Sequence, residues 1–260
     1  MQNFFNSTTS SKVPPQEGFR EAYTLHLGDN ALILGQRNAE WCGHGPVLEQ
    51  DIAITNISLD LIGQARNFYQ YAAQLLGDDT TEDSLAYLRK EREFKNCLVT
   101  EQPNGDWAQT ILRQFLFSNY QYLLYQQLQN HKDEQLAAIA AKALKEVAYH
   151  LRWSSEWVIR LGDGTEESHK RMLKAIDELW RYSGELFIPA EYEKEVGIDV
   201  SLLKNDADNK ISAVFEEASL AVPQNVFMQT GGKEGKHTEH LGYILTELQY
   251  IQRTYPGAEW

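Results

Sequence analysis

The chain has 260 residues, of which 42% are hydrophobic and 23% charged, and its formal net charge at pH 7 is −13. This composition excludes a wholly disordered chain, and the excess of acids argues against nucleic-acid binding, which depends on neutralising phosphates. No apolar run approaches the roughly 20 residues of a membrane helix, and no basic segment followed by an apolar one marks a signal peptide. We therefore expect a cytoplasmic protein with neither a membrane nor a nucleic-acid partner.

The two cysteines, Cys42 and Cys97, are too few for a disulfide framework and do not form a C-x-x-C pair. They fit a reducing compartment and exclude thiol-redox chemistry. Both are expected to be small buried apolar side chains.

Hydrophobic residues recur with a helical period along most of the chain, and strand signals are nearly absent. Residues 1–18 are rich in Asn, Ser, Thr and Pro and are expected to form a flexible tail, followed by a single domain over 19–260. Long helices are predicted over 17–39, 46–76, 106–130 and 133–162, shorter ones over 81–96, 165–184, 201–203, 210–221 and 237–253, and residues 255–260 are expected to be non-helical.

Residues at the predicted helix ends support these limits. Pro46 suits the first turn of the second helix, and Gly77 suits its end. Asp106, followed three residues later by Gln109, predicts a capping box. The middle of the second helix is apolar nearly all round, so we expect it to be buried on most sides; the residues are Ile52, Ala53, Ile54, Ile57, Leu59, Leu61, Ile62 and Ala65.

The four long helices form two predicted hairpins, about 19–39 with 46–76 and 106–130 with 133–162. Their lengths and short connections predict an all-α fold, a four-helix bundle with additional helices packed outside it.

Each long helix carries a polar residue near its middle, namely Asp29, Asp60, Asn119 and Glu146. The four residues lie at similar distances from the two predicted turns, so they fit one layer of the bundle. Ferritin-like bundles hold two irons in such a layer, with a carboxylate from each of two helices and Glu-x-x-His from each of the other two.

The ligand set is incomplete, because Gly63 and Tyr149 stand where the histidines are needed and His150 is one position out of register. The main interpretation is a vestigial polar layer tied up by hydrogen bonds, with Gln64 and Tyr149 as donors. A weak single-metal site and a working di-iron centre remain alternatives. No catalytic, cofactor-binding or metal residue is assigned; the vestigial layer comprises Asp29, Asp60, Asn119, Glu146 and His150.

Several separated motifs, in order, give the chain a specific resemblance over residues 19–260 to the C subunits of bacterial phenylacetyl-CoA epoxidases, also called ring-1,2-phenylacetyl-CoA monooxygenases. The motifs lie at Leu27–Leu32, Gln36–Arg37, Glu40–His44, Asn56–Arg66, Lys145–Arg152, Gly235–Tyr243, Glu247–Arg253 and Tyr255–Trp260.

The resemblance implies a ferritin-like fold and a role in aerobic phenylacetate breakdown. It implies a partner A subunit that carries the di-iron centre and epoxidises the ring with O₂, a bridging B subunit, and a reductase E subunit with flavin and iron–sulfur that takes electrons from NADPH. The C subunit is then a degenerate paralogue without a cofactor of its own that pairs with and supports A. A homodimer of the chain alone stays open.

Other motifs have structural interpretations. Residues 41–46 suit a tight turn with a packed Trp, and residues 231–236 a flexible basic loop, although a contact with a coenzyme A phosphate is an alternative. His237 and His240 lack the spacing of a zinc protease, so capping and partner contact are expected around Thr238. Tyr149, Trp153 and Trp157 fall on one helix face and suit core packing or an interface.

Two further functions are weighed. One is an independent metal-dependent oxidase or hydroxylase that uses Asp29, Asp60, Glu146 and His150 as a reduced ligand set. The other is a ferritin-like assembly protein with no enzyme attached.

Overall fold

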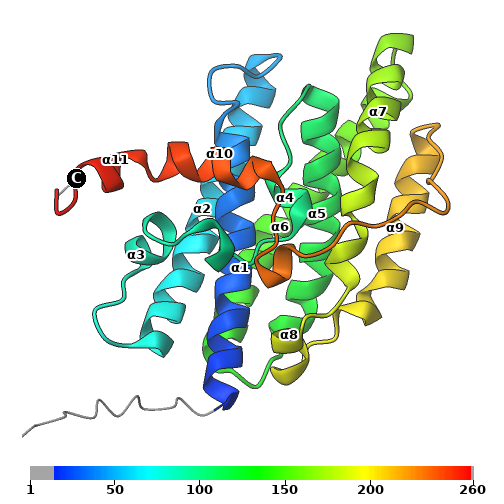
Figure 1. The fold of residues 1–260 in the computed structure, drawn as a ribbon. Coiled ribbons are helices and arrows are strands. Elements are labelled where there is room, and N and C mark those ends of the chain that lie inside the picture. The colour runs from blue at the N-terminus through cyan, green and yellow to red at the C-terminus, as the bar shows by residue number, and fades with distance from the viewer. Residues whose placement is uncertain (1–14, 259–260) are drawn as a thin grey trace, which may run out of the picture.

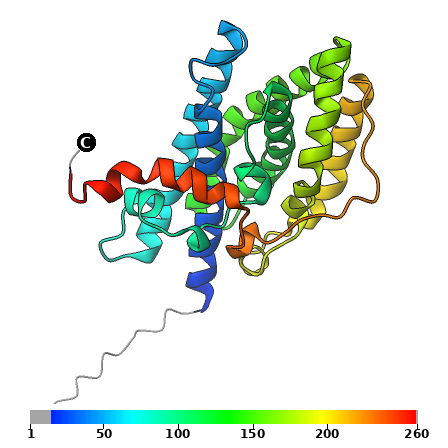
Figure 2. The same cartoon turned by 45° about the horizontal axis from the view of Figure 1, so that its top comes forward.

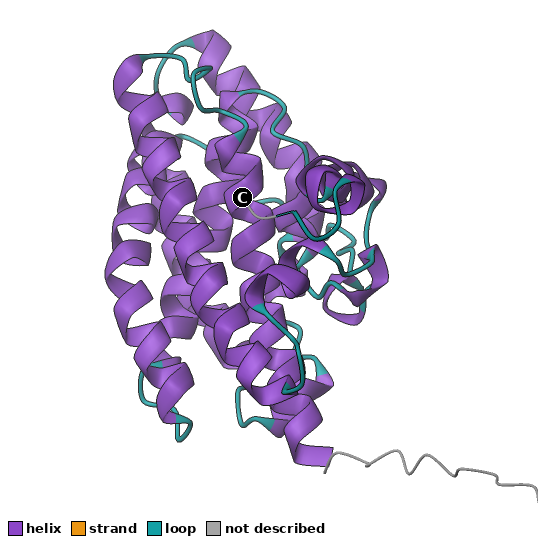
Figure 3. Ribbon diagram, turned by 90° about the vertical axis from the view of Figure 1, so that its left-hand side faces the viewer, coloured by secondary structure: helices purple, strands orange, loops and turns teal. Residues whose placement is uncertain are grey.

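The computed structural model describes residues 15–258, and within this range every regular element is a helix (Figures 1 and 3). The core is a bundle of four long helices, α1 (Pro15–Ala39), α2 (Leu48–Leu76), α5 (Trp107–Leu128) and α6 (Glu134–Gly162). The α1–α2 and α5–α6 hairpins make the most extensive contacts, and α2 packs on α6 to join them. The predicted all-α bundle with outer helices is confirmed.

Shorter helices cover two sides of this bundle. On one side, α7 (Glu166–Leu179) packs on α5 and α6, and α9 (Lys204–Glu217) packs on the same pair. On the other side, α10 (Glu239–Leu248) crosses α1 and continues into α11 (Tyr250–Thr254), which projects past α3 (Glu82–Tyr87) (Figures 1 and 2). The central helix α5 is buried on almost every side as a result.

None of the helices in residues 15–258 is both long and apolar enough to cross a membrane. Short helical turns connect the longer helices. The short elements are η1 (Glu91–Glu93), α4 (Leu98–Glu101), η2 (Trp180–Tyr182), η3 (Gly184–Phe187), α8 (Glu191–Glu195), η4 (Val200–Leu203) and η5 (Gly232–Glu234).

The helix ends show the predicted local chemistry with one exception. The Asp106 carboxylate accepts from the Ala108 and Gln109 amides at 2.9 and 3.2 Å, and the Gln109 side chain accepts from the Asp106 amide at 2.8 Å. Gly77 ends α2 with a φ of 72°, a left-handed value that disfavours side chains with a Cβ. Pro46 lies before α2 rather than in its first turn, because Val47 takes the N-cap position.

Three predicted helix limits are wrong. The helix expected over 81–96 breaks into α3 and η1, because Arg89 and the Lys95 amide turn inward to bond Asp29. The helix expected over 165–184 ends at Leu179, and the following turns direct buried Glu185 toward Gly231. The helix expected over 210–221 begins at residue 204.

At the N-terminus, residues 15–18 belong to α1 and not to a tail, whereas residues 1–14 of the predicted tail lie outside the described residues. Two expectations about burial also fail. Cys97 is buried as predicted, but Cys42 is exposed in the turn after α1. The α2 helix is not buried on most sides, since Ile52 and Leu59 expose 52% and 62% of their surface.

Candidate functional site

The structure brings two of the five predicted layer residues into direct contact. His150 Nε2 on α6 lies 2.9 Å from Asp60 Oδ2 on α2. The imidazole is fully buried, whereas the Asp60 side chain is 36% exposed. His150 Nδ1 is buried without a hydrogen-bond partner. The pair therefore links α2 to α6, with its carboxylate at the surface.

A chain of side-chain amides fills the neighbouring part of the bundle. The Gln64 amide donates to Glu146 Oε2 at 2.9 Å, and the Gln121 amide donates to Gln64 Oε1 at 3.0 Å and to the Tyr125 hydroxyl at 3.1 Å. Gln64 is thus the donor that the sequence predicts. Tyr149 is not, because its ring is 38% exposed on the outer face of α6.

The two remaining layer residues bond elsewhere. Asp29 is fully buried and accepts from the Tyr69 hydroxyl at 2.6 Å, the Lys95 amide at 2.7 Å and the Arg89 guanidinium. Asn119 donates to the Ala207 carbonyl at 3.0 Å on α9. The single layer of five is therefore corrected to a core formed by α2, α5 and α6, with Asp29 and Asn119 in separate contacts.

The residues present do not fit a di-iron centre. Two irons require several carboxylates to bridge them and balance their charge. Here Gln64 on α2 already binds Glu146, and Gln121, the α5 residue that contacts Gln64, is also a buried amide. In the part of the chain that the structure describes, no three His, Cys, Asp or Glu side chains are grouped so that they could hold a metal ion.

A second buried polar system, which sequence reasoning missed, fastens the segment 231–238 to the bundle. Glu185 accepts from the Gly231 and Gly232 amides, each at 2.7 Å. Glu193 pairs with Lys233, whose Nζ lies 2.9 Å from Glu193 Oε2. A signal was available for Glu185, which stands beside the apolar run Leu186-Phe187-Ile188, but not for Glu193, which lies among charged residues.

These contacts correct two interpretations of the C-terminal motifs. The basic loop 231–236 does not offer Lys233 to a phosphate, because that side chain is only 5% exposed and paired with Glu193. The Thr238 side chain does not cap α10; it donates to Glu101 at 2.8 Å. The His237 side chain is fully buried, so it is not a partner contact.

The pKa values of two buried histidines in this region are shifted in opposite directions. His26 lies beside the Lys95 carbonyl, and burial lowers its pKa to about 4, so it is neutral at pH 7. His237 places Nδ1 2.9 Å from Glu101 Oε2 and Nε2 2.9 Å from the Phe94 carbonyl. Because both nitrogens face acceptors, His237 must be protonated to satisfy them. Burial alone would lower the pKa of His237, but the Glu101 carboxylate and the Phe94 carbonyl outweigh burial and raise it.

This arrangement predicts a pH dependence of stability. The pKa of His237 is higher in the folded state than in the unfolded state, where it is about 6.5. The charged imidazole therefore stabilises the fold fully at pH values below about 6.5, and this stabilisation is lost as the pH rises through the pKa of the folded state. We expect His237→Gln to destabilise the protein by about 1.5–3 kcal/mol at pH 6, and by less at pH 9. Urea unfolding of both proteins at the two pH values measures the difference. An equal difference at both pH values would contradict a charged His237.

Four tryptophans form a cluster at the turn that joins α1 to α2. The Trp41 indole donates to Thr110 at 2.9 Å and packs edge-on against Trp107. Trp107 also contacts Trp153 and Trp157 edge-on. The turn with a packed Trp is therefore confirmed, and the indoles of α6 belong to the core.

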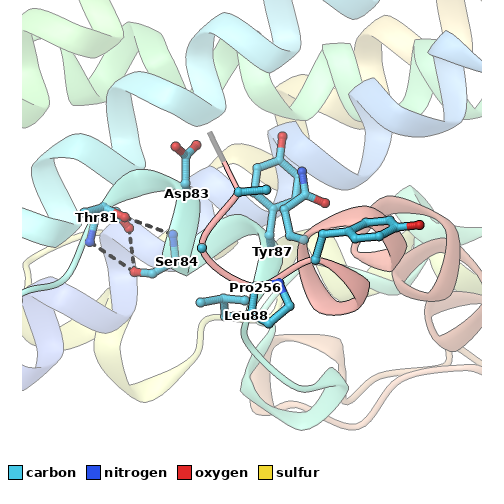
Figure 4. A pocket seen from close by; sticks show the side chains of 10 residues that line it. Thr81, Asp83, Ser84, Tyr87, Leu88 and Pro256 are labelled. Atoms are coloured by element: carbon cyan, nitrogen blue, oxygen red, sulfur yellow. Dashed lines mark hydrogen bonds between the residues drawn. The ribbon is translucent and has the colours of Figure 1, made fainter. Parts of the chain in front are cut away.

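One hollow of about 480 Å³ lies between α3 and the C-terminal segment, away from the polar core (Figure 4). Its Thr81 and Ser84 side chains are engaged in capping α3. Asp83 contributes the one charged side chain that lines it among the described residues. Nothing in this hollow resembles a catalytic arrangement.

Comparisons with known proteins agree with the bundle. Residues 8–260 match the family described as "Phenylacetic acid catabolic protein". The chain is also 50% identical over 244 residues to an Escherichia coli (strain K12) protein that is named as the C subunit of 1,2-phenylacetyl-CoA epoxidase, covering 92% of this chain and 98% of that protein. The chain therefore belongs to the phenylacetic acid catabolic protein family.

Proposed function

We propose that this chain is a structural C subunit of a multicomponent di-iron monooxygenase that epoxidises the ring of phenylacetyl-CoA in aerobic phenylacetate breakdown. The observation that carries the proposal is the amide chain from Glu146 through Gln64 to Gln121, which occupies the part of the bundle where a ferritin-like centre needs carboxylates. The Escherichia coli relative supports the assignment to this complex.

In this proposal the chemistry belongs to the partners. The catalytic A subunit holds the iron and the substrate, the B subunit bridges the assembly, and the reductase E subunit delivers electrons from NADPH through flavin and iron–sulfur. The present chain pairs with A and supports it through its surface, without a cofactor of its own. Such permanent pairing buries upwards of about 2,000 Å².

Metal content tests the degenerate site directly. We expect the chain, expressed alone in iron-supplemented medium, to hold less than ~0.1 iron per chain, because the core lacks the anionic donors that retain it. Plasma mass spectrometry measures the content, and Glu146→Gln serves as the matched variant, with no change expected. A content near two irons per chain that falls in Glu146→Gln would contradict the proposal.

Co-elution tests the supporting role. A purified mixture of this chain and its catalytic partner is expected to run as one complex in size-exclusion chromatography, and separate elution would count against the proposal. The competing function is an independent metal-dependent oxidase. The contact between Asp60 and His150 favours it, because both residues belong to the reduced ligand set that such an oxidase would use. That function requires stoichiometric metal that a chelator removes together with activity.

A further inference from the structure

The hollow between α3 and the C-terminal segment has aromatic and apolar walls (Figure 4). Tyr87 and Leu88 contribute from the end of α3, and Tyr255 and Pro256 contribute from the motif at the end of the sequence. Leu88 and Tyr255 each expose 58% of their surface although they line the hollow. Its volume of about 480 Å³ is within the range of ligand-binding pockets. The hollow is therefore large enough to take a side chain of another molecule.

A hydrogen-bond acceptor in this hollow has no partner. Gln252 lines the hollow, and its Oε1 atom is buried without a hydrogen bond from any residue in 15–258. Buried polar atoms are normally paired, because an unpaired one loses its bonds to water without replacement. The neighbouring Thr81 and Ser84 side chains do not supply a donor, since they bond each other in capping α3. The oxygen therefore suits an N–H donor from another molecule.

The edge of the hollow is acidic. Asp83 lines it, and Asp78 and Asp79 are exposed on the loop that leads into α3. Residues 77–88 contain no Lys or Arg, and Arg89, the next residue, is directed to a buried carboxylate inside the bundle. None of the described residues that line the hollow is basic. The local charge therefore favours a cationic occupant.

The side chain of arginine matches these three properties. Its guanidinium is planar and stacks on aromatic rings, here Tyr87 and Tyr255. Burial and the nearby Asp83 carboxylate raise the pKa of Tyr87, which places the acid beside this ring. The five N–H donors of a guanidinium can serve the Asp83 carboxylate and Gln252 Oε1 together. A lysine ammonium would supply charge and donors, but no flat surface for the rings.

The exposed apolar side chains decide between a free cation and a protein segment. A free guanidinium compound would leave Leu88 and Tyr255 uncovered, whereas residues on either side of an arginine in a segment can cover them. We propose that this hollow is a docking site for an arginine-bearing segment of a partner protein, with apolar residues flanking the arginine. The proposal goes beyond the proposed function, because it does not depend on a role in an oxygenase.

A peptide titration tests the recognition. We expect N-acetyl-Leu-Arg-Leu-amide to bind the full chain with a Kd on the order of 1 mM, measured by NMR from the shifts of the Leu88 methyl groups. The same peptide with citrulline, the neutral analogue of arginine, should bind at least about tenfold more weakly, because the charge-assisted hydrogen bonds are lost. Added salt should weaken the binding of the arginine peptide and leave that of the citrulline peptide unchanged.

Substitutions in the hollow locate the site. Asp83→Asn should weaken binding of the arginine peptide about tenfold, and Gln252→Leu should weaken it severalfold. Asp177→Asn removes the same charge from an exposed position on α7, so it is the matched control and should bind like wild type. Gln252→Leu should also leave the Tm of the free protein unchanged or raised, because it removes an unpaired buried oxygen. A purely structural Gln252 would instead give a lower Tm.

Three results would overturn the proposal. They are no shift of the Leu88 signals at about 10 mM peptide, equal affinities for the arginine and citrulline peptides, and unchanged affinity in Asp83→Asn. Methylguanidine that binds as tightly as the peptide would show a site for a free cation and overturn the assignment to a protein segment. The titrations use this chain alone and involve no metal, so their failure is distinguishable from failure of the proposed function.

Discussion

Replacing Lys233 by Met is expected to destabilise the protein by about 3–5 kcal/mol and to lower its Tm by roughly 10 °C. The Lys233 ammonium lies 2.9 and 3.1 Å from the two Glu193 carboxylate oxygens and donates to the Ile188 carbonyl at 3.0 Å. Glu193 is fully buried, so the substitution leaves an uncompensated charge in the core. Thermal and urea unfolding measure the loss.

The control uses the same segment. Lys236 pairs with Glu234 at 3.1 Å but is 76% exposed, so Lys236→Met should change stability by less than about 1 kcal/mol. Adding Glu193→Leu to Lys233→Met should recover part of the loss, because the unpaired charge is then removed. A Lys233→Met protein as stable as wild type would show that Glu193 is not held as a buried carboxylate.

Replacing Asp29 by Ala is expected to have a similar cost, about 3–5 kcal/mol. The substitution removes the acceptor of the Tyr69 hydroxyl, the Lys95 amide and the Arg89 guanidinium, and the Arg89 side chain is only 10% exposed. Urea unfolding gives the total effect. Hydrogen exchange should show the largest loss of protection in residues 88–96, since Asp29 holds this segment to α1.

Two comparisons make the result specific. Asp29→Asn should cost less than Asp29→Ala, because the amide oxygen still accepts a hydrogen bond while the charge is lost. Arg171→Met on α7, which breaks an exposed ion pair with Glu167, should change stability by less than about 1 kcal/mol. Uniform loss of protection along the chain, with no excess at 88–96, would contradict a local role for Asp29.

The sequence predicts the helices well where local chemistry controls them. The capping box of Asp106 and Gln109 and the stop at Gly77 depend on residues a few positions apart, and both are present. The helix expected over 81–96 fails for the opposite reason. Its breaking point depends on Asp29, some 60 residues away, which draws Arg89 inward against the local helical period.

The polar core shows the same division. Counting from the turns gives the level of a residue along the bundle, and by this measure Asp29, Asp60, Asn119 and Glu146 share one layer, although in the structure Asp60 contacts His150 and Glu146 accepts from Gln64. It does not give the direction in which a side chain points around its helix. Asn119 at a similar level points to α9, and Asp29 to the segment after α3.

Local residue patterns were enough to predict the all-α bundle and its two hairpins, because helical periodicity and caps are written within each segment. Long-range packing, in contrast, decides that Glu185 and Glu193 clamp the segment 231–238 and that the apolar face of α2 remains open. Periodicity reports that a face is apolar, but burial depends on which element packs against it. For α2, no described element of the same chain covers Ile52 and Leu59, so this apolar face stays exposed.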